Sequence, residues 1–238
     1  GSAVGPAHVT AVSELVSGFG VGAFDVTASD DALAKVLVTG SVVVGSCGDE
    51  HIRQLLGVET ACPVAGEPEA FSLKLLTSPK RVLLIGGGPS GVLYGAFALL
   101  RHLRLARVWT AAALDRTERP STSIRMLNHW SQWRGASHAD LWTPPRMAGR
   151  ADSMFDWAAL RLAAAGHANA TKRITDWCRL IASVGINALA PQDVNYDERD
   201  NFLEHLPELR VMGDLVRRFG IKLYWTPNYQ LAPIAADA

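Results

Sequence analysis

The feature that most constrains the fold is a short phrase that occurs twice. It reads SVGIN at residues 183–187 and RFGIK at residues 218–222. In both copies a glycine follows a helical pattern of apolar residues, predicted over 171–184 and 202–219, and precedes a short apolar stretch. Glycine commonly ends helices because it adopts positive φ without strain. Two helices that each turn tightly into a strand are typical of βα units around a parallel sheet, in a barrel or in a doubly wound sheet.

Three short apolar segments predict the strands of that sheet, over residues 123–128, 186–190 and 221–226. Helix-length patterns separate the second segment from the third, so parallel neighbours are expected. The carboxyl ends of parallel strands meet at one edge of a sheet, and functional residues of barrel enzymes gather there. Here those ends supply Asn128 to Trp130, then Gln192 to Asn195, then Asn228 and Tyr229.

The first part of the chain predicts a separate α/β domain. Helical patterns over 9–19, 50–56 and 90–103 alternate with strand-like segments over 35–44, 70–76 and 81–85. A polar stretch containing Pro120 follows and is typical of a linker. The expected organisation is an N-terminal α/β domain at 1–113, a linker at 114–122 and a region of βα units at 123–238.

Charge and hydropathy exclude several classes of partner. The 23 basic and 23 acidic residues balance, so no basic field predicts binding to nucleic acid or to an anionic membrane. Residues 82–100 carry no charge, but their clustered glycines and Pro89 would disrupt a membrane helix of minimal length. A strand, a turn and a helix explain this segment better.

The cysteines and the N-terminal residues give information on the cellular compartment of the protein. Cys47, Cys62 and Cys178 fit neither a zinc spacing nor an even-numbered disulfide framework, so buried free thiols are expected. No secretory leader is visible, which favours a cytoplasmic location. Gly1 and Ser2 resemble a cloning scar, so a leader removed from the natural chain stays open.

Residues 86–91 read GGGPSG and satisfy the dinucleotide fingerprint G-x-G-x-x-G between an apolar strand and a helix. An acidic residue for the ribose is expected about 20 residues later, yet the next acid is Asp115. The favoured interpretation is a strand-to-helix turn whose glycines permit close packing, with flavin or nicotinamide binding through Gly86 to Gly91 as the alternative. No cofactor and no metal are therefore expected.

Several phrases, in order along residues 80–230, resemble family 67 of the glycoside hydrolases, the α-glucuronidases that remove glucuronic acid from xylan side chains. The phrases are Gly91-Val92-Leu93-Tyr94-Gly95, Arg125-Met126-Leu127-Asn128-His129-Trp130, Ala148-Gly149-Arg150 with Ser153-Met154-Phe155-Asp156-Trp157, Arg179 to Asn187, Val194-Asn195 and Gly220 to Tyr224. Departures occur at Ser131-Gln132-Trp133, in the longer loop up to Met147, and at Asp193. These departures bear on the substrate more than on the fold.

The resemblance implies a fold and an activity. The fold is an N-terminal α/β domain followed by the first three βα units of a (β/α)8 TIM barrel. The activity is inverting release of (4-O-methyl)glucuronic acid from xylan-derived oligosaccharides. The resemblance places the catalytic carboxylates on later strands, so no catalytic residue is expected in this chain, and the chain alone is expected to be inactive.

The substrate-binding candidates are Asn128, His129, Trp130, Val194 and Asn195. An indole face stacks on the apolar face of a pyranose, and amides bond its hydroxyls. By resemblance, Trp130 and Val194 line the pocket for the uronic acid. Each candidate also has a structural alternative to binding. Trp130 could be a core aromatic, His129 a core histidine, and the two asparagines could cap strand ends.

The expected partners are a xylo-oligosaccharide or uronic acid, the remainder of the barrel in the same or another chain, and a possible second copy of the chain. The competing function is a non-catalytic carbohydrate-binding fragment, which would bind these sugars without turnover. Nucleic acid and membranes are not expected as partners.

Overall fold

The computed structural model describes residues 5–19, 41–57, 61–77, 80–105, 114–130, 157–192 and 206–224. The chain divides into two compact units. Unit 1 comprises residues 1–123 with 218–220, and unit 2 comprises 124–217 with 221–238. Each unit has its own sheet.

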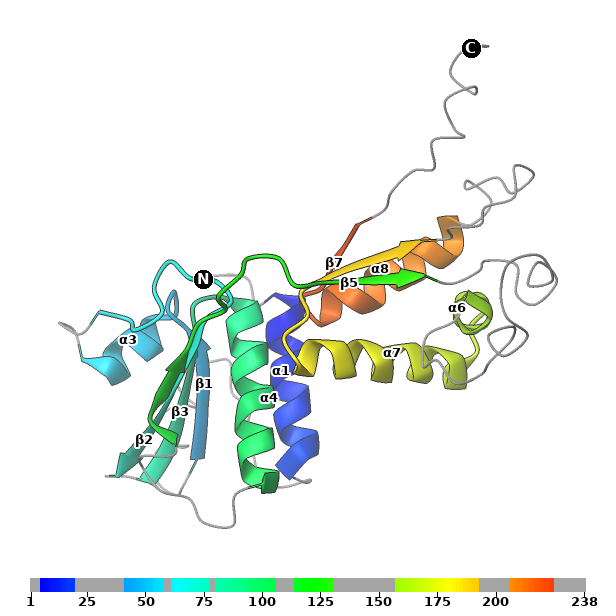
Figure 1. Cartoon of the computed structure of the whole chain (residues 1–238). Coiled ribbons are helices and arrows are strands. Elements are labelled where there is room, and N and C mark those ends of the chain that lie inside the picture. The colour runs from blue at the N-terminus through cyan, green and yellow to red at the C-terminus, as the bar shows by residue number, and fades with distance from the viewer. Residues whose placement is uncertain are drawn as a thin grey trace. The chain divides into compact units, whose positions relative to one another are not determined.

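Unit 1 is built on a four-stranded sheet of order β1-β3-β2-β4 (Figure 1). Its elements are α1 (Pro6–Phe19), β1 (Ser41–Ser46), α3 (Glu50–Leu56), β2 (Phe71–Thr77), β3 (Lys80–Gly86), α4 (Pro89–Leu105) and β4 (Arg116–Glu118). β1 and β3 are parallel, whereas β2 is antiparallel to both β3 and β4.

Both faces of this sheet are covered. α1 and α4 lie side by side on one face, where Leu73, Leu84 and Leu99 are fully buried (Figure 1). On the other face, Ile52 of α3 and Val64 pack with Leu83 and Ile85 in a second apolar cluster. Unit 1 is therefore a three-layer α/β structure.

The uncharged segment 82–100 forms β3, a tight turn and α4, as the sequence predicts. None of the helices among the described residues combines the length and apolar character needed to cross a bilayer. The predicted strand at 35–44 is described only from residue 41.

The segment predicted as a linker contains a strand. Residues 116–118 form β4, which pairs with β2 through Phe71, Ser72 and Leu73. The Arg116 guanidinium donates to the Ala98 carbonyl of α4, with Nη2 and the oxygen 3.3 Å apart. The linker prediction is wrong for these residues, because sheet pairing and this bond outweigh their polar composition.

The prediction of three free thiols is also wrong for two of them. Cys47, directly after β1, and Cys62 form a disulfide with their Cα atoms 5.7 Å apart. The pairing brings together residues from two loops, which their spacing in the sequence does not reveal. The prediction is confirmed for Cys178, which is buried in helix α7 (Ala168–Ser183) and carries no disulfide.

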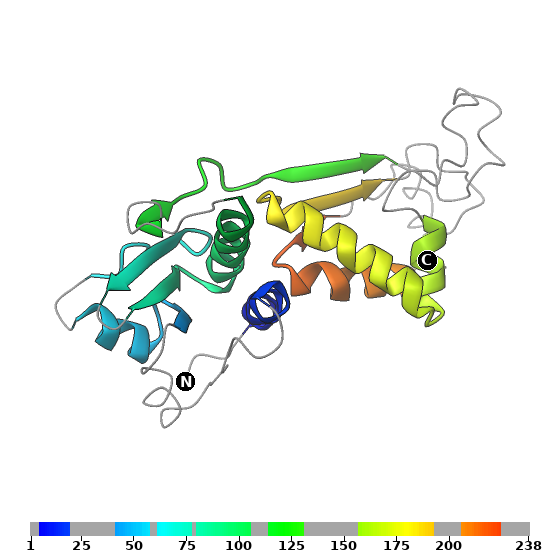
Figure 2. The same ribbon diagram turned by 90° about the horizontal axis from the view of Figure 1, so that it is seen from below.

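Unit 2 is built on a three-stranded parallel sheet of order β5-β6-β7. Its elements are β5 (Met126–Trp130), α6 (Trp157–Ala164), α7 (Ala168–Ser183), β6 (Ala188–Gln192), α8 (Leu206–Arg218) and β7 (Lys222–Leu223). α7 and α8 lie on the same face of the sheet (Figure 2). Helix α6 was not predicted from the sequence.

The two repeated joints have the same geometry. Gly185 and Gly220 have φ of 85° and 69°. The Ile186 N–H donates to the Ile181 carbonyl, and the Ile221 N–H donates to the Val216 carbonyl, at 3.1 Å in each case. Both bonds join residues five apart and close the helix end in the Schellman manner. The two helix-to-strand turns that the sequence predicts are confirmed.

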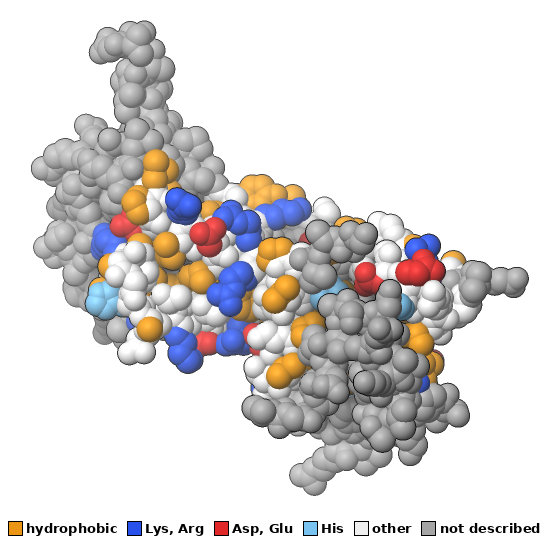
Figure 3. Space-filling view, turned by 180° about the vertical axis from the view of Figure 1, so that it is seen from behind, with side chains coloured by type: hydrophobic (Ala, Val, Ile, Leu, Met, Phe, Trp, Pro, Cys, Tyr) orange, Lys and Arg blue, Asp and Glu red, His pale blue; other side chains and the backbone are white. Residues whose placement is uncertain are grey.

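Charged side chains of both signs are intermixed over the visible face (Figure 3). On α7, Asp176 accepts hydrogen bonds from Lys172, at 2.5 Å, and from Arg179. These bonds, led by that from Lys172, hold the pKa of Asp176 below its usual range. Ion pairs of this kind are typical of a solvent-exposed helix face, and they do not create a positively charged surface.

Candidate carbohydrate-binding site

The candidate site lies at the carboxyl ends of β5 and β6. The parallel register pairs Asn128 with Ala190 and Trp130 with Gln192, so both strands end at the same level. The sequence predicts this edge as the place where polar and aromatic groups gather, and the register confirms that the two strand ends are adjacent.

Strand alternation separates the three candidates of β5. Successive residues of a strand belong to opposite faces of the sheet. Asn128 and Trp130 therefore share one face by register, and His129 belongs to the other, as does Leu127. Asn128 is exposed, whereas Leu127 is half-buried. The register thus puts Asn128 and Trp130 on one face, and the binding roles of all three residues stay predictions.

The opposite ends of the same strands are fixed by a polar pair. The Arg125 N–H donates to Asn187 Oδ1 at 2.8 Å, and the Asn187 N–H donates to the Arg125 carbonyl at 3.1 Å. The Arg125 side chain also donates from Nε to the Gly185 carbonyl at 2.6 Å. Asn187 is only 1% exposed. These bonds hold the two strands in register and so align their carboxyl ends.

Further residues share the face of Asn128. The register places Met126, Ala188 and Lys222 in one row across the three strands. Met126 is 40% exposed, and Tyr224, just after β7, is 39% exposed. The Tyr224 N–H donates to the Leu189 carbonyl at 2.8 Å, which continues the ladder.

On this face, the central strand β6 carries the small residues Ala188 and Ala190, and the two flanking strands carry longer side chains. Tyr224 brings an aromatic ring that the sequence analysis did not select. Its position within the third predicted strand, two residues after Lys222 and so on the same face, was the signal that could have found it.

Val194 and Asn195 lie outside the described residues, as do Asp193, Asp197 and Glu198. Within the described ranges, no three His, Cys, Asp or Glu side chains gather as ligands for a metal ion. Among the described residues, the site therefore contains the amide of Asn128, the phenol of Tyr224 and the apolar alanine side chains of β6.

The glycine turn, residues 86–91 of unit 1, is packed against residues 61–70. A Cβ on Gly87 would lie 2.0 Å from the Glu67 carbonyl oxygen, and one on Gly91 would lie 2.2 Å from that of Ala70. The Gly91 N–H, in the first turn of α4, donates to the Pro68 carbonyl at 3.0 Å. A bound pyrophosphate would need such helix N-terminal donors. The packing interpretation is confirmed.

Solved glycoside hydrolases share this fold. A family GH115 4-O-methyl-α-glucuronidase with specificity for decorated arabinogalactans matches 94% of this chain and 28% of its own, with a TM-score of 0.58 and 15% identity. A GH138 enzyme targeting pectin rhamnogalacturonan II matches 92% of this chain and 23% of its own, with a TM-score of 0.56 and 10% identity. At these identities the similarity defines the fold, a mixed α/β arrangement found in glycoside hydrolases.

Sequence comparison is more specific. Residues 105–237 match the glycosyl hydrolase family 67 middle domain, which covers more than half of the chain. The chain therefore belongs to glycosyl hydrolase family 67.

Curated relatives agree with this assignment. The alpha-glucuronidase A of Emericella nidulans is 30% identical over 150 residues, which are 62% of this chain and 16% of the relative. The alpha-glucuronidase of Hypocrea jecorina is 26% identical over 163 residues, 68% of this chain and 18% of the relative. The chain thus spans less than a fifth of the length of these relatives.

Proposed function

We propose that this chain is a substrate-binding portion of an inverting α-glucuronidase acting on xylan-derived oligosaccharides. Membership of family 67 and the alpha-glucuronidase relatives support the reaction class. The observation that carries the proposal is the register that puts Asn128 and Trp130 on one face at the carboxyl end of a parallel sheet. There the indole would stack on the pyranose and the amide would bond its hydroxyls.

Unit 2 is proposed to be the first three βα units of a (β/α)8 barrel. Its strands are parallel and adjacent in chain order, without the reversal that marks a doubly wound sheet. Its helices α7 and α8 lie on one face (Figure 2), as helices do outside a barrel. The exposed face with Met126 and Tyr224 would then point to the barrel interior and be covered by further strands.

Hydrolysis with inversion needs a carboxylic acid and a carboxylate base on opposite sides of the glycosidic bond. The described part of unit 2 places no carboxylate on the face of Asn128. We therefore assign binding to this segment, and assign the acid and the base to other strands of the whole enzyme.

Titration of the 238-residue chain with an aldouronic acid, followed by NMR, tests the proposal, with glucuronic acid release assayed in parallel. Binding without turnover is expected. Trp130→Ala should weaken binding by roughly fivefold or more, since one stacking contact contributes about 1 kcal/mol or more. Asn128→Ala should weaken binding less, and Asn169→Ala, at an exposed site on α7, should change nothing. Equal affinity of all variants would refute the site.

The alternative is a non-catalytic carbohydrate-binding role for the protein as a whole. This alternative uses the same binding site as the proposed enzyme and differs from it only because the bound sugar is not hydrolysed. Family membership favours the enzyme. Glucuronic acid release by the longest available form of the protein separates the two, because a binding protein would release none.

A further inference from the structure

Residues 61–70, here called the cover, have no helix or strand of their own but lie directly over the glycine turn. The Gly87 N–H donates to the Ala70 carbonyl at 2.9 Å, and the Gly91 N–H donates to the Pro68 carbonyl. The cover thus supplies acceptors for the turn and for the first turn of α4, which has N–H groups without helical partners.

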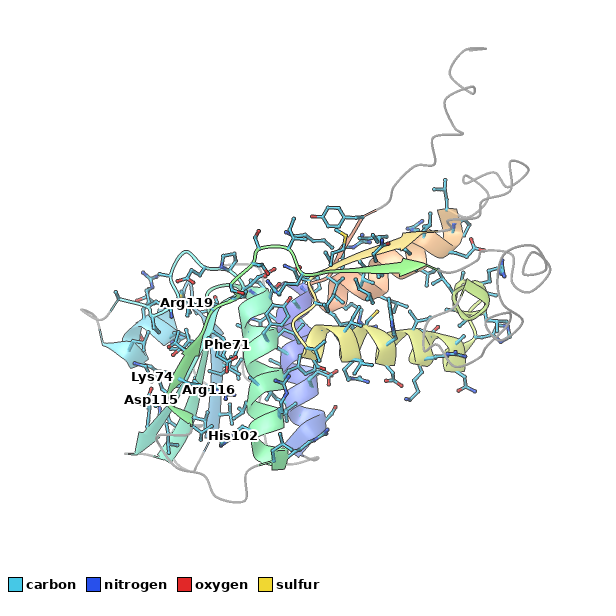
Figure 4. The ribbon with its side chains drawn as sticks, in the orientation of Figure 1. Phe71, Lys74, His102, Asp115, Arg116 and Arg119 are labelled. Atoms are coloured by element: carbon cyan, nitrogen blue, oxygen red, sulfur yellow. A yellow bond between two sulfur atoms is a disulfide. The ribbon has the colours of Figure 1, made fainter. Side chains whose placement is uncertain are left out.

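Three kinds of interaction hold the cover in place. Val64 is fully buried in the apolar cluster beneath α3. Arg119 follows β4 (Figure 4). Its side chain donates to the Glu67 carboxylate at 2.8 Å and to the Pro63 carbonyl at 2.5 Å. Cys62 is joined covalently to Cys47.

The disulfide reaches the carboxyl ends of β1 and β3. Cys47 directly follows β1, and its N–H donates to the carbonyl of Gly86, the last residue of β3, at 2.9 Å. The cystine therefore ties the cover to the carboxyl ends of the two parallel strands, next to the turn that the cover occupies. Both cysteines also pack against the apolar cluster.

We propose that the Cys47–Cys62 cystine, formed by oxidation of two thiols, latches the cover onto the glycine turn. The oxidant is a disulfide of the thiol-exchange class. The Cys47 thiolate attacks this disulfide, forms a mixed disulfide and expels one thiolate. The Cys62 thiolate then attacks Cys47 Sγ and expels the second. Two protein thiols lose two electrons and two protons, and one partner disulfide becomes a dithiol.

Without the cystine, the cover keeps the buried Val64 and its backbone bonds to the glycine turn but loses its only covalent restraint among the described residues. Arg119 and Glu67 are both substantially exposed, and such an ion pair contributes little. The cover would then open locally and expose the N-terminus of α4. A cystine needed for this packing favours maturation in an oxidising compartment over the cytoplasmic location expected from the lack of a visible leader.

The modification is tested on the 238-residue chain, purified without reductant, alkylated in denaturant and digested. A peptide pair linked through Cys47 and Cys62, with Cys178 alone alkylated, is expected. Alkylation of all three cysteines would overturn the proposal.

The latch is tested by hydrogen exchange of peptides covering residues 82–92, before and after treatment with a phosphine reductant. Reduction should speed their exchange by roughly 100-fold, as expected from opening a closed loop of about 15 residues. The double variant Cys47→Ser, Cys62→Ser should match the reduced protein. Cys178→Ala, in unit 2, should leave these peptides unchanged. Unaltered exchange after reduction of the wild-type chain would overturn the latch even if the double variant fails to fold.

Discussion

Asn187→Ala should weaken the bonds that hold the two strands of the candidate site together at their amino ends, and so lower the stability of the fold. The Asn187 side chain accepts the Arg125 N–H at 2.8 Å in a position that is 1% exposed. Removing the acceptor deprives a backbone donor of its bond away from water, which costs about 1–3 kcal/mol. The loss of packed side-chain atoms adds roughly 1 kcal/mol. The expected loss of unfolding free energy is therefore about 3 kcal/mol.

Urea unfolding followed by far-ultraviolet circular dichroism measures this loss. With an m-value of about 2–3 kcal/mol per molar, the midpoint should fall by roughly 1 M at unchanged slope. Asn169→Ala is the matched control, because Asn169 is exposed on α7. A loss below about 0.5 kcal/mol for Asn187→Ala, or equal losses for both variants, would refute the assigned role of the Arg125–Asn187 pair.

Asn187→Asp extends the test, because it keeps an oxygen for the Arg125 N–H but buries a carboxyl group. Burial disfavours the charged form and raises its pKa above that of the unfolded chain. The variant should therefore be destabilised at neutral pH and should recover stability relative to the wild type as the pH falls toward 4. A pH-independent difference would contradict a buried position for this side chain.

Three further predictions concern unit 1 and α7. Gly87→Ala should destabilise the fold by about 1–3 kcal/mol, since its Cβ would meet the Glu67 carbonyl oxygen. Gly48→Ala, whose Cβ would lie 3.8 Å from Ser46 Oγ, should be near neutral in the same urea assay. Burial lowers the pKa of His8 against the opposing charge of Asp49. The unfolded chain therefore binds this proton first, stability should fall as the pH drops below about 6.5, and His8→Gln should flatten that slope in thermal melts. Asp176→Asn should cost about 0.5 kcal/mol at neutral pH, and the difference should vanish as the pH falls through the lowered pKa of this carboxyl in wild type.

The sequence predicts best those parts of the fold that depend on local chemistry. Gly185 and Gly220 end helices because few other residues adopt positive φ, so the two joints could be placed within a residue. The strand, turn and helix of residues 82–100 follow from the glycines and Pro89 in the same way. The site face follows from strand alternation once the register is known.

What the sequence did not predict depends on contacts between distant residues. Cys47 and Cys62 meet only because the cover folds back over the ends of β1 and β3. β4 is polar and three residues long, and it exists because β2 offers it an open edge. Tyr224 joins the site face through a ladder bond to Leu189. None of these features has a local pattern that distinguishes it from a loop.

The two ends of the β5–β6 pair have separable roles, and this separation gives the sharpest test of the site. Arg125 and Asn187 bond each other at the amino end, where they set the register and are remote from the strand ends. Asn128 and Trp130 lie toward the carboxyl end, away from this pair. Asn187→Ala should therefore lower stability and leave the affinity of the folded fraction for an aldouronic acid unchanged, whereas Trp130→Ala should lower affinity with little loss of stability. If both variants lost stability and affinity in parallel, the carboxyl end would be part of the packing core, and Trp130 would be the core aromatic that the sequence leaves open.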